Sequence, residues 1–164
     1  MIKRANQKKK KGFSLIELII VLAVMAIIAL IAIPNFTAVR ENSKVKADTQ
    51  SCETIDRAVL MLVADGTVSS VGTVELVAPI KLNSTTGNYD GITNATGSSF
   101  TEKELNALGE ALKEINKPQG NKIVDSEGTA ASGMTGDHNS LKGYSVEVKA
   151  NGDVIVKTTS EKKA

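Results

Sequence analysis

The sequence predicts an α+β fold, in which one long N-terminal helix packs on a small antiparallel β-sheet domain with one further short helix. Three observations predict this arrangement. One helical pattern runs from residue 13 to about residue 63, strand signals begin only after residue 65, and the last two strands alternate around Asn151-Gly152, a strong hairpin signal. The part after residue 64 is long enough to bury a modest core with the help of the long helix.

The first twelve residues are basic and the segment after them is apolar. Residues 1–12 contain six Lys or Arg and no acidic residue, and residues 13–34 are apolar apart from Ser14 and Glu17. A helix of that length spans the ~30 Å hydrocarbon core of a bilayer, because each residue adds about 1.5 Å. Basic segments stay in the cytoplasm, so we expect a single-pass precursor with the chain after Pro34 outside the cytoplasm.

A secretory signal peptide and an uncleaved membrane anchor are the competing interpretations of this segment. Signal peptides usually have an apolar region of about 7–15 residues and a small-x-small cleavage site. Here sixteen apolar residues run from Leu18 to Ile33, and no Ala-x-Ala occurs among them. Hydropathy alone requires no processing, so an uncleaved anchor with an extracellular binding domain stays open.

The residues at the end of the basic segment carry a resemblance. The chain reads Lys11-Gly12-Phe13-Ser14-Leu15-Ile16-Glu17-Leu18 there, and Pro34 lies in the helix that follows. This pattern resembles the class III signal peptide of the type IV pilin superfamily over about the first 40 residues. The resemblance implies that residues 1–12 are a leader, that a prepilin peptidase cuts between Gly12 and Phe13, and that it methylates the new amino group of Phe13.

Glu17 is the residue of this segment that most needs a partner. A carboxylate in a membrane helix costs about 2.5–3.5 kcal/mol on insertion scales. Cleavage would create a positive charge at Phe13, four residues away on the same helical face, and the two charges could offset each other within one subunit or between subunits. The resemblance implies the second arrangement, in which Glu17 sets the axial register of a filament; a glutamate held near the headgroups is the alternative.

Small residues and a proline mark the rest of residues 13–34, the predicted transmembrane and filament-core helix. Close packing of helices in lipid depends on small residues, so we expect alanines spaced three apart to contact neighbouring helices. These are Ala23, Ala26, Ala29 and Ala32. Pro34 lacks a backbone donor and should bend or loosen the helix.

Residues 35–64 continue the helix but are amphipathic. Val45, Cys52 and Val59 are seven apart, as are Ile55 and Leu62, which places one apolar stripe among charged residues. We expect a β-sheet of the globular domain, residues 65–164, to cover this stripe.

The globular domain shows four local signals. Thr73–Val77 and Ile80–Leu82 are predicted strands, and the polar stretch Asn83–Ser99 is a predicted exposed loop. A capping box of Thr101 and Glu104 begins a helix that Pro118 should stop. That helix should have a hydrophobic staple and an apolar face, formed by Phe100, Leu105, Leu108, Leu112 and Ile115.

The polar stretch Gly120–Gly143 then leads into the predicted hairpin. Its strands are Tyr144–Lys149 and Val154–Thr158, and Ser160–Ala164 is a predicted solvated tail. The predicted core face is Tyr144, Val146, Val148, Val154 and Val156.

Nothing in the sequence indicates an enzyme, and we predict no cofactor and no metal. The chain has one Cys and one His, and neither a nucleophile motif nor a phosphate loop. Cys52 lies on the apolar stripe and His138 in a polar loop, so we expect Cys52 to be a buried packing residue. A single cysteine forms no internal disulfide; in this the chain departs from many Gram-negative pilins and resembles Gram-positive ones.

Calcium binding and nucleic-acid binding are two further possibilities that the sequence does not favour. Asp125, Glu127, Asp137 and Asp153 are scattered acidic residues without the ordered ligand pattern of a calcium loop. The chain has 20 basic and 18 acidic residues, a formal charge of +2, but without residues 1–12 it has 14 basic against 18 acidic, a charge of −4. Net charge therefore does not imply nucleic-acid binding by the mature chain.

The resemblance implies a structural subunit, a major or major-like pilin that forms a helical homo-oligomeric filament. Its expected partners are the prepilin peptidase and methyltransferase, the assembly ATPase with its platform protein, minor pilins, and the cytoplasmic (inner) membrane before assembly. The expected final location is the cell surface, with roles in adhesion, biofilm formation or twitching motility. A pseudopilin of a type II secretion or competence (DNA uptake) system is the alternative.

Overall fold

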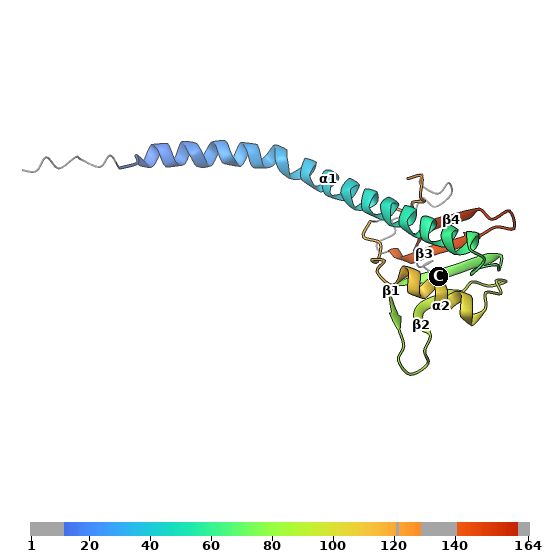
Figure 1. Cartoon of the computed structure of the whole chain (residues 1–164). Helices are drawn as coiled ribbons and strands as arrows, with labels where there is room; N and C mark the ends of the chain where they lie inside the picture. The colour runs from blue at the N-terminus through green and yellow to red at the C-terminus, as the bar shows by residue number, and fades with distance from the viewer. Residues whose placement is uncertain (1–11, 121, 129–140, 161–164) are drawn as a thin grey trace, which may run out of the picture. The chain divides into compact units, whose positions relative to one another are not determined.

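The computed structural model of the chain describes residues 12–120, 122–128 and 141–160 (Figure 1). Its elements are α1 (Leu15–Ala64), β1 (Gly72–Leu82), β2 (Tyr89–Asn94), α2 (Glu102–Leu112), β3 (Leu141–Val148) and β4 (Val154–Ser160). This is the predicted α+β class. The chain divides after Val39 into two compact units, which are described separately below. Residues 1–11 of the predicted leader 1–12, Asp137, His138 and the part of the predicted tail after Ser160 lie outside the described residues.

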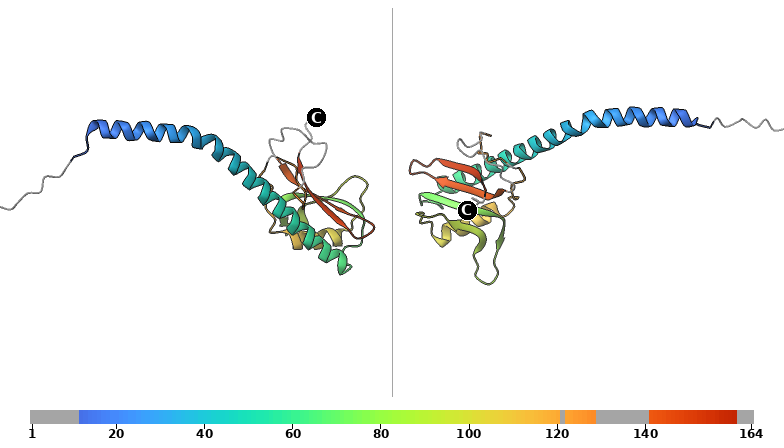
Figure 2. Two further views of the ribbon diagram at one scale, coloured as in Figure 1. Left: turned by 90° about the horizontal axis from the view of Figure 1, so that it is seen from above. Right: turned by 180° about the vertical axis from the view of Figure 1, so that it is seen from behind.

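The second unit contains an antiparallel sheet covered on one face by α1. The strand order is β2-β1-β3-β4, with Val74 opposite Val146 and Val146 opposite Val156. Figure 2 shows the second half of α1 lying across the sheet. Cys52, Ile55 and Val59 of α1 are fully buried in the core between them, so the predicted apolar stripe is confirmed.

The predicted β3–β4 hairpin is confirmed. Lys149 and Asp153 close the turn through a 2.9 Å hydrogen bond from the Lys149 N–H to the Asp153 carbonyl. Gly152 has φ +86°, the left-handed backbone that glycine adopts without a steric cost. Its core face is the predicted one: Tyr144, Val146, Val148 and Val156 are buried, and Val154 is partly buried against the core.

The predicted loop Asn83–Ser99 is wrong, because β2 (Tyr89–Asn94) lies within it. β2 is an edge strand that pairs with β1 alone, and Ile92 is its only buried residue. Polar side chains on the remaining positions therefore hide the strand from a hydrophobic pattern. The predicted strands Thr73–Val77 and Ile80–Leu82 both belong to the single strand β1. The pairing of β1 with β2 shifts register between Leu76 and Lys81, and this irregularity accommodates Pro79.

Helix α2 begins with the predicted capping box. The Oγ1 of Thr101 accepts the N–H of Glu104 at 3.3 Å, and the Glu104 carboxylate accepts the N–H of Thr101 at 2.8 Å. Phe100, Leu108 and Leu112 are buried, and Leu105 is partly buried. The helix ends at Leu112, and Ile115 beyond it still packs against the core.

Glu104 also joins α2 to the loop that precedes β1. Its Oε1 accepts the N–H groups of Ser69 and Ser70, both at 2.9 Å, and the residue is only 5 % exposed. Burial alone would raise the pKa of this carboxyl, but the hydrogen bonds from Thr101, Ser69 and Ser70 outweigh burial and hold the pKa well below its usual range. The ionised form is therefore the one that the fold stabilises.

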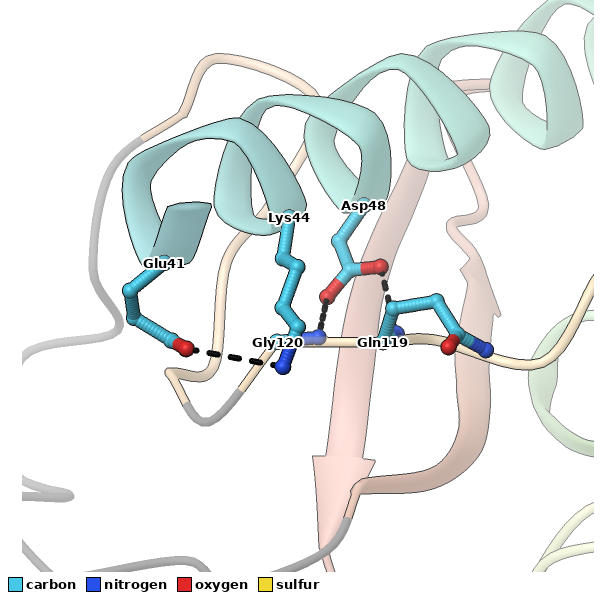
Figure 3. Close-up of polar contacts among 5 residues, drawn as sticks. All are labelled: Glu41, Lys44, Asp48, Gln119 and Gly120. Atoms are coloured by element: carbon cyan, nitrogen blue, oxygen red, sulfur yellow. Dashed lines mark hydrogen bonds and ion pairs between the residues drawn. The ribbon is translucent and has the colours of Figure 1, made fainter. Parts of the chain in front are cut away.

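Asp48 joins the segment after α2 to α1. Its two oxygens accept the N–H groups of Gln119 at 2.8 Å and Gly120 at 2.7 Å, as Figure 3 shows, and the residue is 2 % exposed. A Cβ at Gly120 would come 2.7 Å from the Asp48 carboxylate, so the close approach requires glycine. Glu41 and Lys44, which lie two turns and one turn earlier on α1, form an ion pair at 3.6 Å on the surface.

Replacing Asp48 by Ala should strongly destabilise the second unit, because two backbone N–H donors, that of Gly120 buried and that of Gln119 partly buried, would lose a charged acceptor. Hydrogen bonds to charged groups contribute about 1.5–3 kcal/mol each, so we expect a loss of about 3 kcal/mol. Denaturant unfolding of the full chain in detergent, followed by near-ultraviolet circular dichroism of the tyrosines, measures it. Glu53→Ala, which removes an exposed ion pair with Arg57, is the control and should change stability by about 1 kcal/mol or less. Equal losses in both variants would contradict the role of Asp48.

Glu104 should make stability depend on acid pH. A carboxyl with a depressed folded-state pKa contributes stability that is present above its ordinary pKa of about 4.3 and is lost as pH falls toward the folded value. Glu104→Gln should therefore be less stable than the unmodified chain by about 1.5–3 kcal/mol at pH 7, and the difference should shrink below about pH 4. Unfolding midpoints measured from pH 7 to pH 2 test this, and a difference independent of pH would contradict it.

Candidate functional site

The predicted cleavage junction lies in non-helical chain directly before α1. Gly12, Phe13 and Ser14 precede the first helical residue, Leu15. Phe13 is 86 % exposed, and a Cβ at Gly12 would meet nothing within 4 Å. No part of the described chain therefore covers the Gly12–Phe13 bond, which leaves it accessible to an enzyme.

Glu17 lies in the first turn of α1, three residues after Ser14, which is the last residue before the helix. The carbonyl of Ser14 accepts the N–H groups of Glu17 at 3.1 Å and Leu18 at 3.3 Å, so Ser14 is the N-cap residue. The Glu17 side chain is exposed, and among the described residues it has no hydrogen-bond or ion-pair partner. The helix dipole favours a negative charge in this turn, and the carboxylate is available to a partner outside the chain.

The first part of α1 exposes apolar side chains on every side. All the large ones are at least half exposed: Leu15, Ile16, Leu18, Ile19, Ile20, Val21, Leu22, Val24, Met25, Ile27, Ile28, Leu30, Ile31, Ile33, Phe36 and Val39. Soluble monomers rarely expose a continuous apolar surface of this extent. Each such side chain gains about 1.5–3 kcal/mol when it is fully buried. This surface therefore requires lipid or other apolar protein to cover it.

The predicted packing residues lie on this surface as far as the structure describes them. Ala23, Ala26 and Ala29 are exposed, whereas the side chains of Ala32 and Pro34 lie outside the described part of the chain. Within the described residues no single helix is both long and apolar enough to cross a membrane, but the segments Leu15–Ile31 and Phe36–Ala64 together meet that criterion by length and composition. The packing role of the alanines stays a prediction.

Among its described residues, the second unit shows neither a reactive thiol nor a cluster of metal ligands. Cys52 is buried, and burial, followed by the nearby Asp48 and Asp125 carboxylates, raises the pKa of its thiol to about 12, so the thiol stays protonated at neutral pH. Its Sγ donates to the Val124 carbonyl at 3.7 Å, as expected of a packing residue. In the part of the chain that the structure describes, no three His, Cys, Asp or Glu side chains gather as metal ligands.

Two of the scattered acidic residues belong to separate turns. The Asp125 carboxylate accepts the N–H of Glu127 at 3.1 Å, and Asp153 pairs with Asn151 across the hairpin turn. Each therefore already has a local structural partner.

Sequence reasoning missed Asp48. A signal was present: Asp48 lies three residues after Val45 and four before Cys52, so it is a charge on the apolar stripe. A buried charge needs a partner, but its partners Gln119 and Gly120 are 71 and 72 residues away and follow no local pattern.

Two comparisons with known proteins agree with the N-terminal site. Residues 7–33 match the family model of the prokaryotic N-terminal methylation motif. The prepilin peptidase-dependent protein A of Clostridium perfringens (strain 13 / Type A) is 42 % identical over 113 residues, which cover 68 % of this chain and 72 % of that protein. No solved structure matches the chain.

The matched motif includes the exposed junction, Glu17 and the apolar part of α1, and the similarity to the relative extends well beyond the motif's own length. The chain therefore belongs to the family of type IV pilin-like proteins, which includes pilins and pseudopilins.

Proposed function

We propose that the chain is a major or major-like subunit of a type IV pilus and that it polymerises through its N-terminal helix into a surface filament. The observation that carries the proposal is the apolar surface from Phe13 to Val39, which surrounds α1 and holds in its first turn one carboxylate without a partner among the described residues. Identical helices packed side by side would bury this surface on every side. A membrane would cover it before assembly.

Processing would begin at the exposed junction. A prepilin peptidase hydrolyses the amide between Gly12 and Phe13, which leaves a carboxylate on Gly12 and an amine on Phe13. The amine is protonated at neutral pH and stays basic after methylation. Glycine before the cut leaves the backbone unobstructed by a side chain, and Phe13 becomes the mature N-terminus.

The new cation would pair with Glu17 of a neighbouring subunit. An unpaired charge in an apolar helix bundle is costly, whereas a pair of opposite charges offsets much of the desolvation. The pairing is satisfied at one axial offset between parallel helices, so it sets the register of each incoming subunit. Repetition of this head-to-tail contact does not close on itself and generates a helical filament.

The remaining partners follow from this function. The precursor would cross the cytoplasmic membrane once, with the second unit outside, and an assembly ATPase with its platform protein would extract it. Ala23, Ala26 and Ala29 would give neighbouring helices room for close approach. Minor pilins would join the same filament at the cell surface, with adhesion, biofilm formation or twitching motility as its role.

The pseudopilin of a type II secretion or competence system is the second candidate, because the methylation motif and the peptidase-dependent relative support both. An uncleaved anchor with an extracellular domain is the third, and it would leave the Gly12–Phe13 bond intact. Filament length and processing separate the three.

Removing the Glu17 carboxylate should block assembly without blocking processing. Glu17→Ala leaves the junction intact, but the amine of each incoming subunit would lose its partner, and breaking a buried pair costs about 3–5 kcal/mol. We expect filament yield to fall by about tenfold or more. Intact mass spectrometry should still find an N-methylated Phe13 terminus.

Glu17→Asp is the matched control, because it keeps the charge in the same turn and should retain part of the yield. Normal filament yield from Glu17→Ala would sink the register role. Loss of cleavage in Glu17→Ala would show that Glu17 acts at processing instead.

Electron microscopy of material sheared from cells should show long filaments that an antibody against the second unit labels. The pilus assignment predicts such filaments at native expression and their loss on deletion of the chain. Failure to find them, together with loss of exoprotein secretion or DNA uptake in the deletion strain, would replace the pilin by the pseudopilin assignment.

A further inference from the structure

The apolar surface of α1 is followed directly by basic residues. Val39 is its last large apolar side chain, and Arg40 is the next residue of the helix. Lys44 and Lys46 follow within two turns; Arg40 and Lys46 are exposed, and the Lys44 side chain is 38 % exposed. From Leu15 to Val39 the helix extends about 37 Å, which exceeds the ~30 Å hydrocarbon core of a bilayer. In a membrane-inserted chain, these basic residues therefore fall in the layer of lipid headgroups.

The fold brings two further lysines to the same end of the second unit. Asp48 of α1 accepts the N–H groups of Gln119 and Gly120, which holds this segment against the helix (Figure 3). Gly120 lies at the level of Val45, because a Cβ added to this glycine would be 3.5 Å from the Val45 Cγ2. Exposed lysines flank the attached segment on both sides. We call the whole group the basic collar: Arg40, Lys44, Lys46, Lys117 and Lys122.

The collar concentrates positive charge in a unit that is otherwise acidic. Residues 40–164 contain 14 basic and 17 acidic residues. Five of the basic residues form the collar, and its acidic neighbours are Glu41, the buried Asp48, and Glu114, which lies beside Ala47. The rest of the unit therefore has nine basic and 14 acidic residues.

Most of the collar's charges have no counter-charge within the described chain. Lys44 pairs with Glu41 at 3.6 Å. Among the residues that the structure describes, the other four cations form no ion pair. A group of unpaired cations at the end of an apolar helix is a surface that fits anionic groups at the edge of a membrane.

We propose that the basic collar binds the phosphate groups of anionic phospholipids on the outer surface of the cytoplasmic membrane while the chain is membrane-inserted. Lys and Arg side chains donate charge-assisted hydrogen bonds to phosphate oxygens. Lipid is the source of these phosphates because the collar continues the same helix that lipid must cover. The inference rests on the membrane-inserted precursor of the proposed function and adds its lipid partner. The contact holds one end of the second unit at the membrane until the subunit is extracted.

NMR of the full chain in lipid nanodiscs tests the contact residue by residue. Discs of phosphatidylcholine are compared with discs in which phosphatidylglycerol, an anionic lipid, replaces a rising fraction of it. The amides of Gly120 and Lys122 should shift as this fraction rises, whereas the amide of the buried Val146 should not. High salt should reverse the shifts, because it screens charges at the membrane surface. Residue-resolved signals keep the basic residues before Gly12 from contributing to the result.

A matched pair of double variants measures the effect of charge at the collar. Each Lys near an anionic membrane surface contributes about fivefold in affinity. Lys117→Gln with Lys122→Gln should therefore raise the midpoint of the phosphatidylglycerol titration at Gly120 by about tenfold or more. Lys103→Gln with Lys149→Gln removes two exposed charges outside the collar and should change the midpoint less than twofold.

Three results would overturn the proposal. The first is an absence of phosphatidylglycerol-dependent shifts at Gly120 and Lys122, and the second is an equal effect of the two double variants. The third is that dissolved glycerol phosphate or a short DNA duplex, added to phosphatidylcholine discs, shifts these amides while phosphatidylglycerol does not. That result would assign the collar to a free anion or to nucleic acid. None of these measurements requires filaments, so a chain that makes no filaments but shows the lipid-dependent shifts would sink the pilus assignment and keep this inference.

Discussion

The constraint on which the structure depends is the apolar surface formed by Phe13 and by α1 as far as Val39, which no other described part of the chain covers. So large an exposed apolar area is unfavourable in water, so this surface needs lipid or apolar protein to cover it. A single carboxylate in this surface, Glu17, then becomes decisive. Under the proposed function, its position next to the Gly12–Phe13 bond would couple processing to assembly, because the partner charge would not exist until cleavage creates the Phe13 amine.

The second unit holds its loops in place without a disulfide. Cys52 is a free, buried thiol. Two buried carboxylates hold the loops instead. Asp48 holds the backbone of Gln119 and Gly120 on α1, and Glu104 holds the backbone of Ser69 and Ser70 on α2. Both accept backbone N–H groups from distant segments, so each charged side chain acts as a cross-link between two parts of the chain.

Much of the fold could be predicted from the sequence, because the signals for its elements are local. The long helix, the Thr101–Glu104 cap and the β3–β4 hairpin each have periodicity or turn residues that are complete within a few residues. β2 was missed because an edge strand with one buried residue, Ile92, leaves no alternation to detect. The role of Asp48 was missed because its partners are brought close only by the fold, and the residue roles at Gly12, Phe13, Glu17 and Pro34 stay predictions.

A map of the assembled filament at side-chain resolution tests the central claim most directly. The account predicts that the amine of Phe13 in one subunit lies within ion-pair distance, about 4 Å or less, of the Glu17 carboxylate in a neighbouring subunit. It also predicts that the apolar side chains from Leu15 to Val39 are buried among copies of α1. A filament in which Glu17 faces water, or in which the chain still begins before Phe13, would contradict it.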